Sequence, residues 1–209
     1  MVHQFFLEKR PHNAMKYQEY IDSLKQKIEL INKNNLTEYE GISANLLKLN
    51  YQRSTRIEKT YKVNKDLCEQ IKKIQKPQLW LILSEHWCGD SAQIIPYISK
   101  FAECNNLIDL RILERDKNLD IMDLYLTNGT RSIPKLIAFD NHGNELFQWG
   151  ARPKEAQDLV NKLKAEGKTK EEFLEQLHIW YAKDQGKSIE KEFYEIIFNL
   201  VNHYNQMEK

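Results

Sequence analysis

The chain of 209 residues contains no long hydrophobic run. No stretch approaches the ~20 apolar residues that a helix needs to cross a bilayer, and the first residues lack the apolar segment of a secretory signal. We therefore expect a cytoplasmic protein that makes no membrane contact. Hydrophobic residues at 41% and charged residues at 29% are ordinary values for a globular protein, which argues against disorder throughout.

Cysteine is scarce, with three residues and no paired spacing. An odd number without pairing is not a disulfide framework and agrees with a reducing compartment. Cys104 follows Cys88 on what we expect to be one helix, so at ~1.5 Å per residue the two lie about 24 Å apart, too far for a bridge. We expect Cys68 and Cys104 to be buried and inert, and Cys88 to work alone. No metal site is expected, because the cysteines and histidines lack ligand spacing.

A strong excess of one charge is also missing, since the formal net charge is +1. The distribution is uneven: residues 1–76 hold 15 Lys and Arg against 9 Asp and Glu. Such asymmetry can indicate an acidic partner. Here the basic residues are scattered among acidic ones without an aromatic stacking motif, so we expect a solvated helical surface and no nucleic-acid partner.

The middle of the chain has the pattern of a mixed α/β sheet. The run 79–83 is continuously apolar, which is typical of a strand covered on both faces. Apolar residues recur at helical spacing over 91–105, and 108–114 alternates as a second strand. That order predicts a parallel pair with a right-handed crossover. Strands over 135–139 and 145–149, joined by a turn, predict an antiparallel hairpin in the same sheet.

Helical periodicity dominates the N-terminal part. One amphipathic helix is predicted over 13–34, a second begins at Thr37, and a third begins after an Asn64 cap. We therefore divide the chain into a helical N-terminal extension over 1–76 and a core over 77–167.

The C-terminal part is predicted to be helical as well. A helix over 152–165 is followed by a capping box of Thr169 and Glu172 that opens another helix. Ser188 is expected to cap the last helix of this extension, which covers 168–209. Its aromatic residues are expected to pack internally, and a homodimer formed through the helical extensions is the alternative left open.

One thiol lies where the first core strand ends and a helix begins. The junction has the sequence Trp87-Cys88-Gly89-Asp90-Ser91. Unpaired backbone N–H groups and the dipole favour negative charge at the start of a helix, and the thiolate is the nucleophilic form of cysteine. The position of Cys88 therefore points to a reactive thiol.

This junction resembles the thioredoxin family, whose motif there is Trp-Cys-Gly-Pro-Cys. Four further matches occur at family spacing over about residues 78–165: Pro96, Asp116-Lys117-Asn118, Arg131-Ser132-Ile133-Pro134 and Gly150. The resemblance looks closest to a bacterial subgroup with a helical N-terminal extension and a Trp-Cys-Gly-Asp motif. It implies a thioredoxin-like fold, with a mixed central sheet of about four strands flanked by helices.

The resemblance also implies a substrate groove beside the thiol. Its wall is the Ile133–Pro134 bond, which is cis in the family, and Gly150 lies next to the groove. Trp87 is expected to flank the thiol and cover the groove. We assign these residues, with Gly89 and Asp90, to substrate binding.

The motif has one thiol instead of two. A dithiol enzyme uses a second cysteine to release its mixed disulfide, and that position holds Ser91, which cannot do so. Its hydroxyl can instead donate to the Cys88 sulfur and favour the thiolate. The Asp90 carboxylate repels a thiolate, so we expect a Cys88 pKa below the free value of about 8.5 but less depressed than in strongly oxidising relatives.

The family's buried acid, which helps to move protons, is replaced by Ile82. The absence of this acid fits a site that does not release its mixed disulfide with a second thiol of its own. His86 lies near the thiol in sequence and can serve as a proton carrier, although an exposed histidine without a role is the expected alternative.

We therefore expect a thiol–disulfide exchange protein of monothiol type, with Cys88 as nucleophile and Ser91 as thiolate donor. It would be an enzyme that reduces or isomerises mixed disulfides of protein thiols or of glutathione, with no cofactor other than glutathione as a co-substrate. One alternative is a redox-inactive thioredoxin-like module that binds proteins. Another is iron–sulfur handling of the kind seen in monothiol glutaredoxins, whose motif is Cys-Gly-Phe-Ser.

Overall fold

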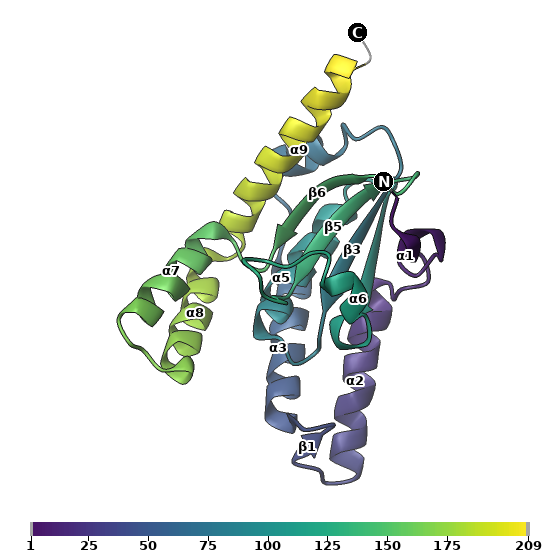
Figure 1. Ribbon diagram of the computed structural model, residues 1–209. Helices are drawn as coiled ribbons and strands as arrows, with labels where there is room; N and C mark the ends of the chain where they lie inside the picture. Colours follow the sequence, from purple (N-terminus) through teal and green to yellow (C-terminus); the bar gives the residue numbers. More distant parts are fainter. Residues whose placement is uncertain (1, 208–209) are drawn as a thin grey trace.

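A four-stranded mixed sheet forms the centre of the protein (Figure 1), in a computed structural model that describes residues 2–207. The strands are β3 (Gln78–Ser84), β4 (Ile108–Glu114), β5 (Lys135–Asp140) and β6 (Glu145–Gly150). They lie in the order β4-β3-β5-β6, with β3 parallel to β4 and antiparallel to β5, and β6 antiparallel to β5. The predicted fold class and the four predicted strands are confirmed.

β3 is buried along its whole length because both faces of the sheet are covered. Trp80 and Ile82 point to one face and pack with the apolar side of α5 (Gly89–Ala102). Successive side chains of a strand alternate between faces, so Leu81 and its neighbours Leu79 and Leu83 face the other side. There they pack against residues of α1 (Gln4–Leu7) and α6 (Leu119–Met122). This double coverage explains the continuous apolar run.

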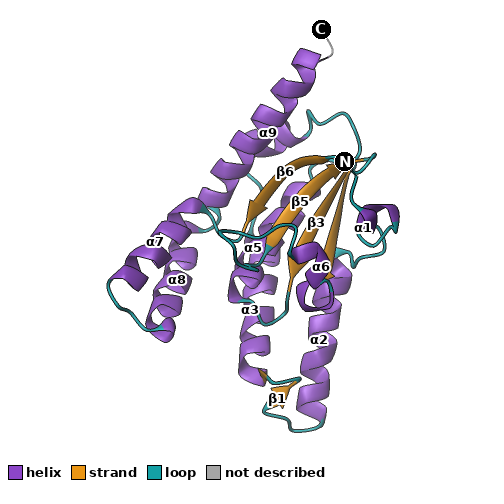
Figure 2. Ribbon diagram, in the orientation of Figure 1, coloured by secondary structure: helices purple, strands orange, loops and turns teal. Residues whose placement is uncertain are grey.

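Two long helices of the N-terminal extension lie side by side below the sheet in Figures 1 and 2, namely α2 (Tyr17–Lys33) and α3 (Ala44–Thr60). The helix predicted to begin at Thr37 starts later, because a small hairpin of β1 (Glu38–Tyr39) and β2 (Ile42–Ser43) comes first. Its turn places Gly41 at φ +75°, a conformation that glycine adopts without steric cost. The third helix, α4 (Lys65–Ile71), begins where predicted, with the Asn64 side chain accepting from the Asp66 amide.

A short 3₁₀ turn, η1 (Arg115–Lys117), links β4 to α6. Asn118 precedes α6, but its side chain does not cap the helix. The Asn118 amide group donates instead to the carbonyl oxygen of Glu114 at the end of β4, at 2.7 Å. That bond ties the turn to the strand.

The C-terminal extension consists of α8 (Lys170–Asp184) and α9 (Lys187–Met207), which follow α7 (Lys154–Ala165). The predicted capping box is confirmed, since Thr169 and Glu172 exchange backbone hydrogen bonds at the start of α8. Ser188 is not a cap, because α9 begins one residue earlier. Figure 1 shows α7 and α8 beside the lower end of α5, while α9 runs past the sheet and projects beyond it.

The main hydrophobic core joins all three predicted parts of the chain. Tyr20 of α2, Trp80 of β3 and Phe193 of α9 belong to one cluster of buried residues. The division of the chain at residues 76 and 167 stays a prediction. Within residues 2–207, the structure contains no helix with the length and hydropathy of a membrane span.

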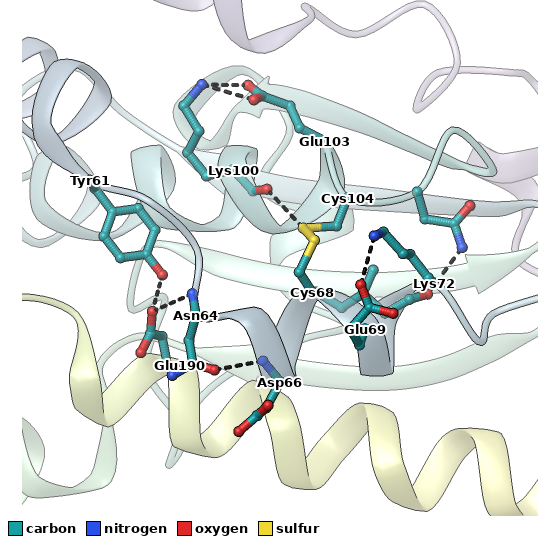
Figure 3. Close-up of a disulfide and its surroundings, with 12 residues drawn as sticks. Tyr61, Asn64, Asp66, Cys68, Glu69, Lys72, Lys100, Glu103, Cys104 and Glu190 are labelled. Carbon is teal, nitrogen blue, oxygen red and sulfur yellow. Dashed lines mark hydrogen bonds and ion pairs between the residues drawn. A yellow bond between two sulfur atoms is a disulfide. The ribbon is translucent and has the colours of Figure 1, made fainter.

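The prediction of three free cysteines is wrong. Cys68 of α4 and Cys104, just beyond the end of α5, form a disulfide with their Cα atoms 5.5 Å apart (Figure 3). Both residues are half-buried, not fully buried as expected. The spacing of the two cysteines along the chain does not predict this disulfide, because the packing of α4 against α5 brings the two sulfur atoms together. The disulfide removes the cysteine-based support for a cytoplasmic location, which stays a prediction.

Candidate active site around Cys88

Cys88 lies at the C-terminal edge of β3 and is the N-cap of α5. Its sulfur accepts a hydrogen bond from the Ser91 backbone amide at 3.4 Å. The thiol in turn donates to the carbonyl oxygen of Ile133 at 3.4 Å. Cys88 is the one free cysteine of the chain and only 7% of it is exposed. Sequence reasoning placed the thiol correctly at the helix start but did not anticipate its burial.

Burial raises the pKa of the Cys88 thiol to about 11, and the neighbouring Asp90 carboxylate adds to the rise. The proximity of the Ser91 hydroxyl and of the amides of Ser91 and Asp90 favours the thiolate but does not compensate. The expected Cys88 pKa below 8.5 is therefore wrong. That expectation took account of the stabilisation of a thiolate at a helix start but not of the desolvation of the buried thiol. Ser91 Oγ is buried and lacks a well-formed hydrogen bond within the described part of the chain, so it stays available to an ionised sulfur.

Asp90 anchors the C-terminal helices to the start of α5. One carboxylate oxygen lies 2.7 Å from an Arg152 Nη, and the other accepts from the Tyr181 hydroxyl at 2.7 Å. Only 6% of Asp90 is exposed. A buried carboxylate needs such partners, because an unpaired charge would be costly. The structure thus engages Asp90 inside the protein, whereas the sequence suggested contact with substrate.

The predicted groove wall lies directly beside the thiol. The Ile133–Pro134 bond is cis, as the family resemblance implies. Gly150 packs on it at φ +124°, and an added Cβ there would press against the Pro134 carbonyl oxygen and the Lys135 backbone. Only glycine fits this conformation and this space. Ile133 therefore contacts the thiol and lines the cavity, whereas Pro134 and Gly150 lie behind it and are not among the residues that line the cavity.

A cavity of about 340 Å³ opens next to the sulfur. Trp87 lines it as predicted, and the Arg115 guanidinium lies over the Trp87 ring, 5.0 Å from its centre. The His178 ring of α8 packs against Gly89 at the start of α5. A Cβ added at Gly89 would lie only 2.9 Å from that ring. The complete lining comprises Leu46, Trp87, Cys88, Gly89, Asp90, Arg115, Arg131, Ser132, Ile133, Arg152, Lys170, Leu174 and His178.

His86 does not belong to this cavity. It is 4% exposed, and its Nε2 lies 3.1 Å from both the Ser23 hydroxyl and the Tyr20 carbonyl oxygen of α2. Burial, with a smaller effect of Lys27, lowers its pKa to about 4. Neither sequence interpretation is right, because His86 is neither exposed nor placed to exchange protons with Cys88. It joins the end of β3 to α2.

The sequence analysis missed two apolar residues of the cavity, Leu46 and Leu174, and four charged or polar ones, namely Arg115, Arg152, Lys170 and His178. A signal existed for Arg152, because a buried carboxylate at Asp90 requires a cation and Arg152 follows the predicted groove glycine closely. Lys170 and His178 belong to α8, far along the chain, and no local pattern places that helix over the thiol. Burial and nearby arginines lower the pKa of His178 to about 4, so its ring is neutral at pH 7.

Comparison with known proteins agrees with this architecture. A family model described as thioredoxin matches residues 35–166, more than half of the chain. A protein of unknown function from Pseudomonas aeruginosa is 17% identical with a TM-score of 0.55, over 88% of this chain and 98% of that one. An HIV epitope scaffold is 17% identical with a TM-score of 0.52, over 72% and 86%. These two structures show the fold alone, and a search of curated proteins finds no match.

Proposed function

The chain belongs to the thioredoxin family, and from this premise we propose that it carries out thiol–disulfide exchange of monothiol type. Cys88 is the nucleophile, and Ser91 stands where a second thiol would resolve the product. Trp87, Gly89, Ile133, Pro134 and Gly150 form the substrate surface, with Asp90 as their internal anchor. The finer placement in a bacterial subgroup with a Trp-Cys-Gly-Asp motif belongs to the same proposal.

One observation carries the proposal: a free sulfur hydrogen-bonded to a helix-start amide lies beside the Ile133 carbonyl and faces a cavity. A purely structural cysteine has no need of an adjoining cavity. In the exchange step, the Cys88 thiol first loses its proton to solvent, and the resulting thiolate attacks one sulfur of a disulfide RSSR. A Cys88–SR bond forms, the other RS⁻ leaves and takes up a proton, so the atoms and electrons balance.

The raised pKa slows this step without preventing it. At pH 7 a thiol of pKa about 11 is ionised roughly once in 10⁴ molecules, about 300-fold less than a free cysteine of pKa about 8.5. A more basic thiolate is also more nucleophilic, with a Brønsted coefficient of about 0.4–0.5, which recovers roughly tenfold. The net loss is roughly 20- to 30-fold, small enough to leave measurable exchange.

The same pKa makes the adduct persistent. A mixed disulfide is broken fastest when the departing thiol has a low pKa, and Cys88 is a poor leaving group by this measure. No other free thiol exists in the chain to resolve the bond internally. Glutathione or a partner's own thiol must therefore finish the cycle, and we expect the mixed disulfide to accumulate.

The test is incubation of the purified protein with glutathione disulfide, followed by intact-mass spectrometry. We expect one glutathione adduct per chain, located at Cys88 by peptide mapping and absent from Cys88→Ser. The matched control is Ser91→Ala, which keeps the thiol and should still form the adduct. Absence of an adduct over hours, or an adduct that survives Cys88→Ser, would refute the assignment.

A second candidate is a thioredoxin-like module that binds proteins without redox chemistry. The burial of Cys88 and its raised pKa favour it, since they leave little thiolate at neutral pH. The adduct experiment separates the two functions. A folded protein whose Cys88 stays unmodified by glutathione disulfide even at pH 9 would favour the binding module.

A further inference from the structure

Helices that flank the thioredoxin-like core line the cavity at Cys88. Leu46 of α3 lines it on one side, and Leu174 and His178 of α8 line it on another. Its volume of about 340 Å³ lies at the lower end of the range for small-molecule sites, about 300–1,000 Å³. The space beside the sulfur therefore suits a small molecule better than a folded partner.

The lining of the cavity is strongly cationic. Arg115, Arg131, Arg152 and Lys170 contribute four positive charges, against the single carboxylate of Asp90. Arg152 neutralises Asp90 at 2.7 Å, which leaves three further cations among the residues that line the cavity. In a partly enclosed cavity, charges of one sign concentrate the field and attract the opposite charge.

Two of these cations have partners outside the lining. Arg115 pairs with Asp116 at 2.6 Å and Arg131 with Asp123 at 2.6 Å, and about half of each aspartate is exposed. Such exposed pairs contribute little energy and are screened by salt. Arg131, whose pair with Asp123 is exposed on both sides, can therefore be shared with a bound carboxylate at small cost.

Lys170 is different, because its side chain makes no ion pair or hydrogen bond with any residue in the range 2–207. It stands at the first position of α8, immediately after the Thr169 cap, and lines the cavity. Its placement depends on the docking of α8, to which the hydrogen bond from Tyr181 to Asp90 contributes. The start of α8 thus places an unpaired cation at the cavity beside Cys88.

We propose that the Cys88 cavity selects small disulfides that carry carboxylate groups, with Lys170 and Arg131 as the residues that determine this specificity. The inference rests on the proposed thiol–disulfide exchange and names its substrate class. The carboxylates of the incoming disulfide pair with the two cations while one of its sulfur atoms meets Cys88. The reaction is the exchange already written, with the disulfide itself as the oxidant.

The test compares three small disulfides of different charge: 3,3′-dithiodipropionate (anionic), bis(2-hydroxyethyl) disulfide (neutral) and cystamine (cationic). The rate of Cys88 adduct formation is measured by intact mass and divided by the rate of each reagent with a free cysteine peptide. We expect the normalised rate to be at least 10-fold higher for dithiodipropionate than for cystamine at low salt. We expect the ratio to fall toward one in 0.5 M salt, because salt screens the attraction.

Matched variants assign the effect to the cavity. Lys170→Glu should lower the anionic-to-cationic ratio several-fold, whereas Lys183→Glu, the same charge change on an exposed position of α8 outside the cavity, should leave it unchanged. Glutamate is favourable in the first turn of a helix, so Lys170→Glu should stay folded, as circular dichroism will check. Arg131→Gln should lower the ratio as well.

The outcomes separate the two proposals. No adduct with any of the three reagents would refute the exchange function itself. Adducts with all three at equal normalised rates, or an equal effect of both lysine variants, would refute only the charge selectivity. A fourth reagent, an acidic peptide disulfide of the same net charge as dithiodipropionate, tests for a protein substrate, and a faster normalised reaction with it would overturn the small-molecule assignment.

Discussion

The two ends of α5 hold the two kinds of cysteine in this protein. At the start of the helix, Cys88 is free, buried and hydrogen-bonded to a backbone amide. Just beyond the other end, Cys104 is half-buried and bonded to Cys68 of α4. The contrast shows that a helix does not decide the chemistry of its thiols. A neighbouring element does, because α4 brings a second sulfur to one end while α8 and the groove wall enclose the other.

The largest effect is expected in the pH dependence of Cys88 alkylation, which tests whether burial controls this thiol. With a pKa raised to about 11, the thiolate fraction, and with it the rate of alkylation by iodoacetamide, should rise roughly 10³-fold between pH 7 and 10. A free cysteine of pKa about 8.5 would gain only about 30-fold and level off near pH 9. A plateau below pH 9 would show that the helix start outweighs burial.

The other end of the helix is tested by removing its disulfide. The bond closes a loop with a sequence separation of 36, which corresponds to about 4 kcal/mol of stability in chain-entropy terms. Cys104→Ser should therefore lower the free energy of unfolding in urea by about that amount, and Cys68→Ser should match it. Cys88→Ser is the control and should cost clearly less. Equal midpoints for all three variants would contradict the prediction.

The electrostatic origin of the difference is tested by Asp90→Asn. Removing the carboxylate takes away a charge that raises the Cys88 pKa and leaves Arg152 beside the sulfur without its partner. The Cys88 pKa should fall, and alkylation at pH 8 should become several-fold faster. Asp109→Asn, which removes an exposed carboxylate paired with Arg111, should leave the rate unchanged. An unaltered pKa in the folded Asp90 variant would show that desolvation alone sets it.

The smallest effect is expected for Tyr181→Phe. The substitution removes one buried hydrogen bond to Asp90 and keeps the ion pair with Arg152. The loss should be about 1.5–3 kcal/mol, since a hydrogen bond to a charged group is involved. Unfolding in urea measures it, and hydrogen exchange of α8 should increase. If α8 is as protected as in the unchanged protein, Asp90 is not what anchors it.

The sequence was sufficient for most of the fold because the relevant signals are local. Three sequence patterns each indicated the element in which they lie: the apolar run around Trp80, the alternation over 108–114 and the capping box at Thr169. The structure contains the corresponding elements β3, β4 and α8. Sequence reasoning failed for the hairpin around Gly41, where apolar spacing continued through a turn.

The candidate site was predictable only in part. Cys88 and the wall of Ile133, Pro134 and Gly150 follow from motif positions that the fold brings together. The roles of Asp90 and His86 did not follow, because both depend on partners from distant helices. Asp90 meets Tyr181 of α8 and His86 meets α2, and spacing along the chain does not encode either contact.

By itself, the sequence determined where the strands and helices form and which sulfur lies at a helix start, because periodicity and capping act over a few residues. Only the tertiary structure decided that Cys88 is desolvated, that Cys68 meets Cys104, and that α8 places Lys170 at the thiol. These properties depend on burial and on charges brought together from far apart in the chain. Since desolvation and Coulomb interactions act through space, the reactivity of the site could be settled only once the helices were packed.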